Sequence, residues 1–347
     1  MEPKEAKHAP DASDDSSRQR VSRRFLPLAS VVGAFGIVQS GLRPDATPAS
    51  AAPAASSGAT PNLPPTVPVP PLPQTYTRRA VVAGYGLPGE FRRSLLGLAL
   101  GTRDAVYALG DDEVRVFEAN GRIARSWKAP EKASCVGVAP DGRAAVGSPG
   151  RVDLYDEKGA HIGGFAAGTR DRAAEVTAVR FVRDSILVAD AAARIIRRYD
   201  IHGAEQGVIG AGNKTGGFML PNKSLDFDVD LAGVVHATDT GRHRVTSWTL
   251  DGKMLASFGK FGMARPEDFV GCCNPVNVAV ALDGGIVTAE KVLARVKVFS
   301  KGRSLLAVIG PEHFDPMCRH IHIAVDSTGR IVAADPERRT VAVFERS

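Results

Sequence analysis

Three cysteines and two histidines near the C-terminus are the residues whose types and spacing best suit chemistry. They are Cys272, Cys273, Cys318, His320 and His322. Residues two apart in a strand point to one face, so Cys318, His320 and His322 would share a face if this segment is a strand. Thiolate and imidazole groups bind soft and borderline metals, so one hypothesis is a zinc or copper site. Cys318 and His322 would be roughly 13 Å apart along a strand, so only adjacent members could share an ion.

The same cysteines allow other interpretations. Cys318 could form a disulfide with Cys272 or Cys273, and Cys273 is the better partner because neighbouring strand residues face opposite ways. Alternatively, the thiols are buried as small apolar groups. Redox chemistry by the adjacent pair Cys272 and Cys273 is a further hypothesis, although no activating motif surrounds these two thiols.

An alignment of neighbouring segments adds ligand candidates. Residues 278–280 (Val-Ala-Val) match residues 323–325 (Ile-Ala-Val), which places Asn277 opposite His322, and Asp226 occupies the same position one unit earlier. We therefore expect Asp226, Asn277 and His322 to lie in one layer, where an acid, an amide and an imidazole could contact a ligand.

Glu290 and Lys291 are further candidates for a ligand contact. They lie where the chain turns between two predicted strands, and such turns are exposed at the rim of a sheet. A local ion pair is the simpler interpretation of this dipeptide.

A repeated unit must position these candidates. A complete unit has an apolar strand, a second strand, a third ending in an aromatic residue, a glycine turn and a fourth strand. In the last four units the second strand ends at an acidic residue, which is Asp190, Asp239, Glu290 or Asp335. The aromatic position recurs at intervals of 38 to 51 residues, at Phe117, Tyr155, Tyr199, Trp248, Phe299 and Phe344. Periods of this length are typical of propellers and solenoids. We interpret the aromatic residues as core.

The sixth unit ends at Ser347 after its third strand. Residues 78–86 (RRAVVAGYG) resemble the fourth strands of the other units and could supply the missing one. Such closure removes exposed strand edges, which invite aggregation. The sequence therefore predicts an all-β fold, a six-bladed β-propeller over residues 76–347 that is closed by an N-terminal strand.

Two segments resemble a known family of propellers. Residues 238–245 (TDTGRHRV) and 251–253 (DGK) resemble the NHL-repeat signature, with Arg242 where the family usually has Asn. Residues 271–275 (GCCNP), with Glu290 and Lys291 downstream, are similar to a subgroup of exported bacterial NHL proteins. The resemblance implies a rim of loops that binds a protein, peptide or other ligand.

The N-terminal region is expected to contain a targeting segment followed by a linker. Residues 1–42 combine an arginine-rich segment with the uncharged stretch 25–42, which is typical of an export signal or a single membrane anchor. Residues 22–26 (SRRFL) resemble a twin-arginine signal but lack its usual residue between the arginine pair and Phe-Leu. Residues 43–75 hold ten prolines and should form a disordered linker. The body would then lie outside the cytoplasm, in the periplasm or tethered to the membrane.

Composition narrows the function less than it narrows the fold. Apolar residues make up 44% of the 347 residues, aromatic residues 6% and charged residues 24%, and the net charge is +6. No run of apolar residues supports several membrane spans, and so small a positive charge does not require nucleic acid, which we do not expect as a partner.

Two functions remain from these residues and the resemblance. The favoured one is a non-enzymatic, extracytoplasmic binding or scaffold module for a protein or small ligand. Its expected partner is a protein or peptide that binds at a propeller rim and that could be associated with the membrane. The alternative is a metal-dependent lyase or hydrolase at the channel mouth, since some NHL-like propellers, including the lyase of peptide amidation, hold zinc with histidines there. No catalytic group could be carried over from that lyase.

Overall fold

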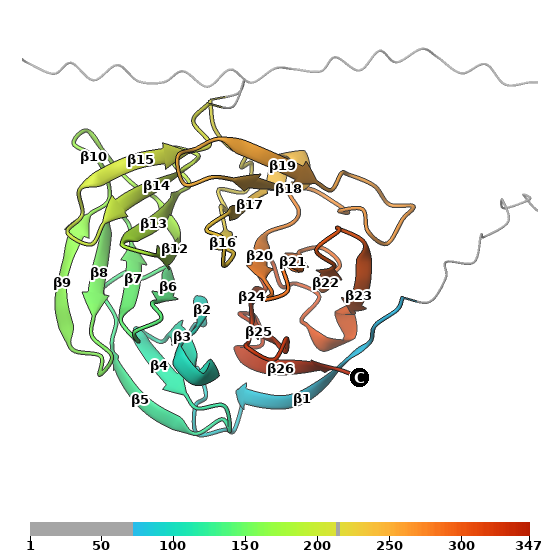
Figure 1. Cartoon of the computed structure of the whole chain (residues 1–347). Helices are drawn as coiled ribbons and strands as arrows, with labels where there is room; N and C mark the ends of the chain where they lie inside the picture. Colours follow the sequence, from blue (N-terminus) through green and yellow to red (C-terminus); the bar gives the residue numbers. More distant parts are fainter. Residues whose placement is uncertain (1–71, 213–215) are drawn as a thin grey trace, which may run out of the picture. The chain divides into compact units, whose positions relative to one another are not determined.

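The repeat predicted from the sequence is confirmed as six four-stranded antiparallel sheets. The computed structural model describes residues 72–212 and 216–347, whose regular structure is almost entirely β-strand. Figure 1 shows the sheets as blades around a common centre. The chain is an all-β six-bladed propeller over these residues. The expected export signal or anchor (1–42) and most of the expected linker (43–71) lie outside the described residues.

In the first five blades the four strands follow chain order from the centre outward. Blade one has β2 (Gly97–Leu100), β3 (Val106–Gly110), β4 (Glu113–Phe117) and β5 (Ile123–Lys128), and blade two has β6 (Cys135–Val138), β7 (Ala144–Ser148), β8 (Arg151–Tyr155) and β9 (His161–Ala166). Blade three has β12 (Val176–Val182), β13 (Ser185–Asp190), β14 (Ile195–Asp200) and β15 (Glu205–Ile209). Blade four has β16 (Phe227–Val229), β17 (Val235–Asp239), β18 (Arg244–Trp248) and β19 (Met254–Phe258), and blade five has β20 (Asn277–Val280), β21 (Ile286–Glu290), β22 (Arg295–Phe299) and β23 (Leu305–Ile309).

Blade six closes the ring with strands from both ends of the described residues. It contains β24 (His322–Val325), β25 (Ile331–Asp335), β26 (Thr340–Arg346) and, as its outermost strand, β1 (Tyr76–Ala83). β1 pairs antiparallel with β26, with Tyr76 opposite Arg346 and Val81 opposite Ala342. The predicted N-terminal closing strand is therefore confirmed (Figure 1).

The connections between strands define two faces. Because the strands of a blade alternate in direction, the loops between blades and the turns between second and third strands lie on one face, which we call the upper face. The remaining turns form the lower face. Short elements in these connections are the hairpin β10 (Gly168–Thr169) and β11 (Arg172–Ala173) and the 3-10 turns η1 (Thr102–Asp104), η2 (Thr240–Arg242) and η3 (Pro311–His313).

The innermost strands form a closed ring of their own. β2, β6, β12, β16, β20 and β24 each contact the innermost strands of both neighbouring blades. Every one of these strands begins at the upper face, because it follows a connection between blades. Side chains at the first positions of the six strands are thereby gathered at one level of the central channel.

Aromatic residues fill the space between blades, as expected. The aromatic residue near the end of each third strand is buried. Most of these rings pack on a ring from a neighbouring segment, as between Phe218 and Trp248 (5.8 Å between centroids) and between Phe258 and Phe299 (5.3 Å). Large flat rings bury much apolar area between adjacent sheets. None of the helices in the described part of the chain has the length and apolar character to cross a bilayer.

Candidate functional site

The predicted layer of Asp226, Asn277 and His322 is present at the narrow level of the channel. The three residues come from blades four, five and six and line one small cavity together with Cys135 and Thr177. The cavity volume is about 20 Å³, which leaves room for roughly one water molecule. The channel is nearly closed at this level, so a larger ligand would have to bind above or below it.

Asp226 and Asn277 join neighbouring blades through hydrogen bonds. The Oδ2 atom of Asp226 accepts the backbone N–H of Val278 at 2.9 Å, and Oδ1 of Asn277 accepts the N–H of Ile323 at 3.1 Å. Adjacent innermost strands do not pair as a sheet, so their inward N–H groups need other acceptors. These two candidates for ligand contact therefore act first as links between blades four, five and six.

Arg180 is a charged group at this site that sequence reasoning missed. It lies on β12, and its guanidinium faces Asp226 at 3.7 Å and Asp228 at 3.4 Å. Burial opposes the charge of Arg180, but these two carboxylates outweigh burial and raise its pKa. Burial also raises the pKa of Asp226 to about 6, although Arg180 acts against the rise. The signal in the sequence was a lone arginine inside an otherwise apolar strand (VTAVRFV).

The two histidines lie together at the upper mouth of the channel. The rings of His320 and His322 are 4.9 Å apart, and Nδ1 of His320 lies 3.5 Å from the hydroxyl of Ser224. Burial and the charge of Lys291 lower the pKa of His320 to about 4. Burial, with smaller effects of His320 and Arg180, holds the pKa of His322 well below its usual range. Both imidazoles are therefore neutral at pH 7 and keep a lone pair on the ring.

Cys318 does not join this histidine pair. Its side chain is 1% exposed and belongs to the apolar cluster between blades five and six, together with Phe314, Ile321 and Phe344. Burial and the nearby carboxylate of Asp335 raise the pKa of the thiol to about 12. Over residues 72–212 and 216–347, no three His, Cys, Asp or Glu side chains are grouped so that they could hold a metal ion. His320 and His322 are thus the residues of this cluster that could bind a metal ion, and the expected ligand Cys318 does not join them.

The expected disulfide between Cys318 and Cys273 is not formed. All four cysteines of the described residues are free. The thiol of Cys273 instead faces that of Cys272, with 2.7 Å between the two Sγ atoms. The strand rule that separates neighbouring side chains does not apply here, because the two residues lie in the loop between β19 and β20 and Cys273 adopts a left-handed conformation (φ +65°).

Glu290 is enclosed by its own blade. It is 0% exposed, and its carboxylate pairs with Lys297 at 2.5 Å and Arg295 at 3.2 Å. Two equivalent acids make similar contacts, since Asp190 pairs with Arg197 at 2.9 Å and Asp239 pairs with two arginines of its own blade. Asp335 instead accepts backbone N–H groups. The recurring acid is thus structural, and Glu290 forms its ion pair within its own blade and not with the adjacent Lys291 of the simpler interpretation.

Lys291 is held at the upper face by its backbone. Its N–H donates to Oδ1 of Asn274 at 2.9 Å, and its carbonyl accepts from Nδ2 of Asn274 at 3.0 Å. The positive charge of its side chain acts on both His320 and Cys273. The charge of Lys291 therefore favours the deprotonated forms of both a histidine of one pair and a cysteine of the other.

Exposed apolar side chains gather on the upper face. Of the sixteen large apolar residues exposed among the described residues, nine lie in upper-face loops, which are Tyr85, Leu87, Leu96, Met219, Phe261, Met263, Val292, Leu293 and Met317. The last six of these belong to loops that enter or form blades four to six, and we call them the apolar rim. The loops that carry Met263 and Val292 touch, since the side chain of Asn274 in the first loop hydrogen-bonds the backbone of Lys291 in the second. The sequence alone did not separate these residues from the core.

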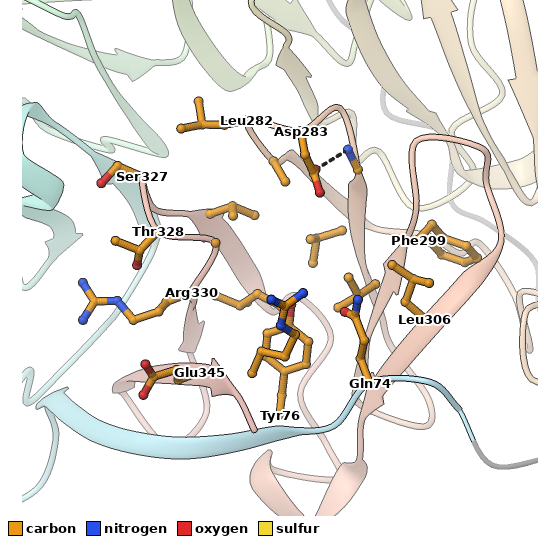
Figure 2. A pocket seen from close by; sticks show the side chains of 18 residues that line it. Gln74, Tyr76, Leu282, Asp283, Phe299, Leu306, Ser327, Thr328, Arg330 and Glu345 are labelled. Carbon is orange, nitrogen blue, oxygen red and sulfur yellow. Dashed lines mark hydrogen bonds between the residues drawn. The ribbon is translucent and has the colours of Figure 1, made fainter.

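A second cavity lies on the lower face between blades five and six. Figure 2 shows its walls, which include Gln74 and Tyr76 near the start of the described residues, Leu306 from β23 and Arg330 from blade six. Its volume is about 440 Å³. None of the residues predicted as candidates from the sequence lines this cavity.

Solved structures with a similar fold are known, although their sequences differ strongly from this chain. No protein-family model matches the chain, and no curated protein does so. A solved streptogramin B lyase is similar over 78% of this chain and 98% of its own, with a TM-score of 0.55 and 9% identity. A Bacteroides thetaiotaomicron protein of unknown function covers 79% of this chain and 76% of its own, with a TM-score of 0.56 and 13% identity. A catalytically inactive virginiamycin B lyase from Staphylococcus aureus, solved with quinupristin, has a TM-score of 0.52 and 10% identity and covers 78% of this chain and 99% of its own.

Proposed function

We propose that the protein is an exported NHL-like propeller whose upper face binds a protein or peptide partner, with no catalytic role. The observation that carries this proposal is the apolar rim. Monomeric soluble proteins seldom expose contiguous apolar patches, and larger ones mark interaction sites. Methionine is frequent at surfaces that adapt to a partner, and the rim contains Met219, Met263 and Met317.

The narrow level of the channel at Asp226 and Asn277 also supports binding over catalysis. A catalytic site needs polar groups that face the substrate with room beside them. Asp226 and Asn277 are engaged by backbone groups of the next blade, and the cavity beside them holds about one water. Their geometry suits a rigid scaffold that holds the loops of the upper face in place.

A binding comparison between the two faces tests the proposal. In one variant, Phe261→Ser, Met263→Ser and Val292→Ser remove part of the apolar rim. The matched control carries Ile201→Ser, Leu231→Ser and Leu282→Ser, which are exposed on the lower face. We expect a partner from envelope fractions to be retained by the wild type and by the control but at least tenfold less by the rim variant. Equal retention by all three proteins would refute the proposal.

A metal-dependent lyase or hydrolase is the second candidate. Two neighbouring neutral imidazoles, His320 and His322, favour it because they can supply two of the ligands that zinc or copper prefers. Structures named as lyases are also among those with a similar fold. Metal analysis of the purified protein decides between the candidates. One bound zinc or copper per chain, lost in His320→Gln and His322→Gln, would favour the enzyme.

The proposed location outside the cytoplasm rests on residues 1–42. Cell fractionation with an antibody to the propeller tests it. We expect the protein in the periplasm or at the membrane, and replacement of Arg23 and Arg24 by Lys to hold it in the cytoplasm.

A further inference from the structure

The adjacent residues Cys272 and Cys273 form an unusual pair of thiols. Neighbouring residues are poorly placed for a disulfide, because their Cα atoms are about 3.8 Å apart whereas ordinary disulfides span about 4.4–6.8 Å. In this loop, however, the left-handed conformation of Cys273 turns both side chains to the same side. The two Sγ atoms are in contact, at 2.7 Å.

The loop that carries the pair is held firmly from below. Asn274 is 0% exposed, and its side chain donates to the carbonyls of Val270 and Lys291 and accepts the N–H of Lys291. Gly271 before the pair is left-handed as well (φ +73°). The conformation that brings the two thiols together is thus fixed by the fold and does not depend on the side chains of the cysteines themselves.

The two thiols differ in exposure. Cys272 is exposed at the upper face, whereas Cys273 is 3% exposed. Burial and the contact with Cys272 raise the pKa of Cys273 to about 11, against the charge of Lys291. A reactive cysteine must be reached by its partner as a thiolate. Cys272 is therefore the group that an external disulfide can reach, and Cys273 is the group that can attack Cys272 afterwards.

We infer that Cys272 and Cys273 are a thiol–disulfide exchange site, which closes to a vicinal disulfide when it meets an external disulfide. The thiolate of Cys272 attacks one sulfur of the external disulfide, whose S–S bond breaks and releases one thiol after protonation. Cys273 gives up its proton and attacks Sγ of Cys272, which breaks the mixed disulfide and releases the second thiol. The protein pair loses two electrons, and the external disulfide gains them.

This inference does not depend on the proposed partner or on a metal. The other two cysteines provide internal controls, because Cys135 and Cys318 are buried in separate apolar clusters between other strands. Their side chains are only 6% and 1% exposed, so an external disulfide cannot reach either thiol. Neither should react in the folded protein.

Mass spectrometry of the whole chain tests the inference. The reduced protein is incubated with oxidised glutathione, denatured in acid, alkylated and digested. We expect two of the four thiols to become resistant to alkylation, both on the peptide with residues 272 and 273, which becomes two hydrogen atoms lighter. Four alkylated thiols, a lasting glutathione adduct on wild-type Cys272, or a bridge to Cys318 would overturn it.

A second variant keeps the test decisive. In Cys273→Ser the second attack is impossible, so we expect glutathione to remain attached to Cys272. Cys135→Ser serves as the matched control and should close the pair as the wild type does. If Cys273→Ser carries no glutathione while its other thiols are normally protected, Cys272 is not the entry point and the exchange sequence is wrong.

Discussion

The carboxylate of Asp226 accepts a hydrogen bond from the backbone N–H of Val278 at 2.9 Å, and this bond joins the innermost strands of blades four and five. Asn277 makes the same kind of link to Ile323 in blade six. The polar layer of the channel is therefore part of what keeps the ring closed. Its chemistry as a ligand site is secondary to this structural task.

Substitution of Asp226 by Asn should change how stability depends on pH. Burial raises the pKa of Asp226 to about 6, above the value near 3.8 of the unfolded chain. The folded form keeps a proton that the unfolded form releases, so this contribution to stability is present below about pH 4 and is lost as the pH rises through 6. Asn keeps the acceptor for Val278 without the charge. We expect the free energy of unfolding of Asp226→Asn, relative to wild type, to rise by about 2–3 kcal/mol from pH 4 to pH 7. Urea unfolding at four pH values measures it, and parallel curves would contradict it.

The histidine pair should change stability with pH in the direction opposite to that of Asp226. The pKa values of His320 and His322 are lowered in the folded protein, chiefly by burial, whereas an unfolded histidine titrates near about 6.5. Their contribution is present above that value and is lost as the pH falls toward 4. Between pH 7 and pH 5, we expect the melting temperature of His320→Gln to fall by less than that of the wild type. His202→Gln on an outer turn is the control and should follow the wild type. A loss in His320→Gln equal to that of the wild type would argue against this account.

The buried ion pair of Glu290 should matter far more than an exposed one. Glu290→Gln leaves the ammonium of Lys297 enclosed without its partner. Loss of one member of a buried pair costs about 3–5 kcal/mol. Burial lowers the pKa of Lys297 to about 8, so the difference from wild type should shrink between pH 7 and pH 10, where the wild-type lysine also loses its charge.

Glu345→Gln is the matched control for that experiment. Its partner is Arg79 at 2.7 Å, and both side chains are largely exposed. Exposed pairs contribute about 0–1 kcal/mol. Chemical denaturation of both variants measures their free energies of unfolding. Equal decreases in the two variants would contradict the structural role of the Glu290 ion pair in blade five.

Removal of the closing strand should open the ring. A chain that begins at residue 72 keeps β1, whereas one that begins at residue 84 leaves the edge of β26 unpaired. Unpaired edges promote aggregation. We expect the longer protein to be monomeric with a single thermal transition and the shorter one to aggregate or to lack a transition. Light scattering and calorimetry measure both, and a stable monomer beginning at residue 84 would contradict the account of closure.

The sequence predicted the fold well because the propeller repeats its signals. The aromatic residue recurs in all six units, the turn glycine in five and the acid in four, for reasons of packing, so each copy supports the others. The same repetition gives the register, and aligning the first strands of three units places Asp226, Asn277 and His322 at one level. The closing strand was found because the last unit lacked one.

The site was predicted less well, since it depends on loops that do not repeat. The alternation of side chains along a strand predicts that Cys272 and Cys273 face opposite ways, but they precede β20 in a loop whose left-handed conformation brings them together. The side chain of Arg180 enters the channel from a strand far away in sequence. The exposure of the apolar rim follows from loop geometry, which hydrophobicity alone does not reveal.

Site-specific photo-cross-linking tests the proposed binding face most directly. A photoreactive amino acid replaces Met263 on the apolar rim in one protein and Leu231 on the lower face in another, and both are exposed at these positions. After irradiation in cells, we predict a discrete cross-linked protein for position 263 and none for position 231. A cross-link from position 231 with none from position 263 would contradict the proposal that the upper face binds the partner.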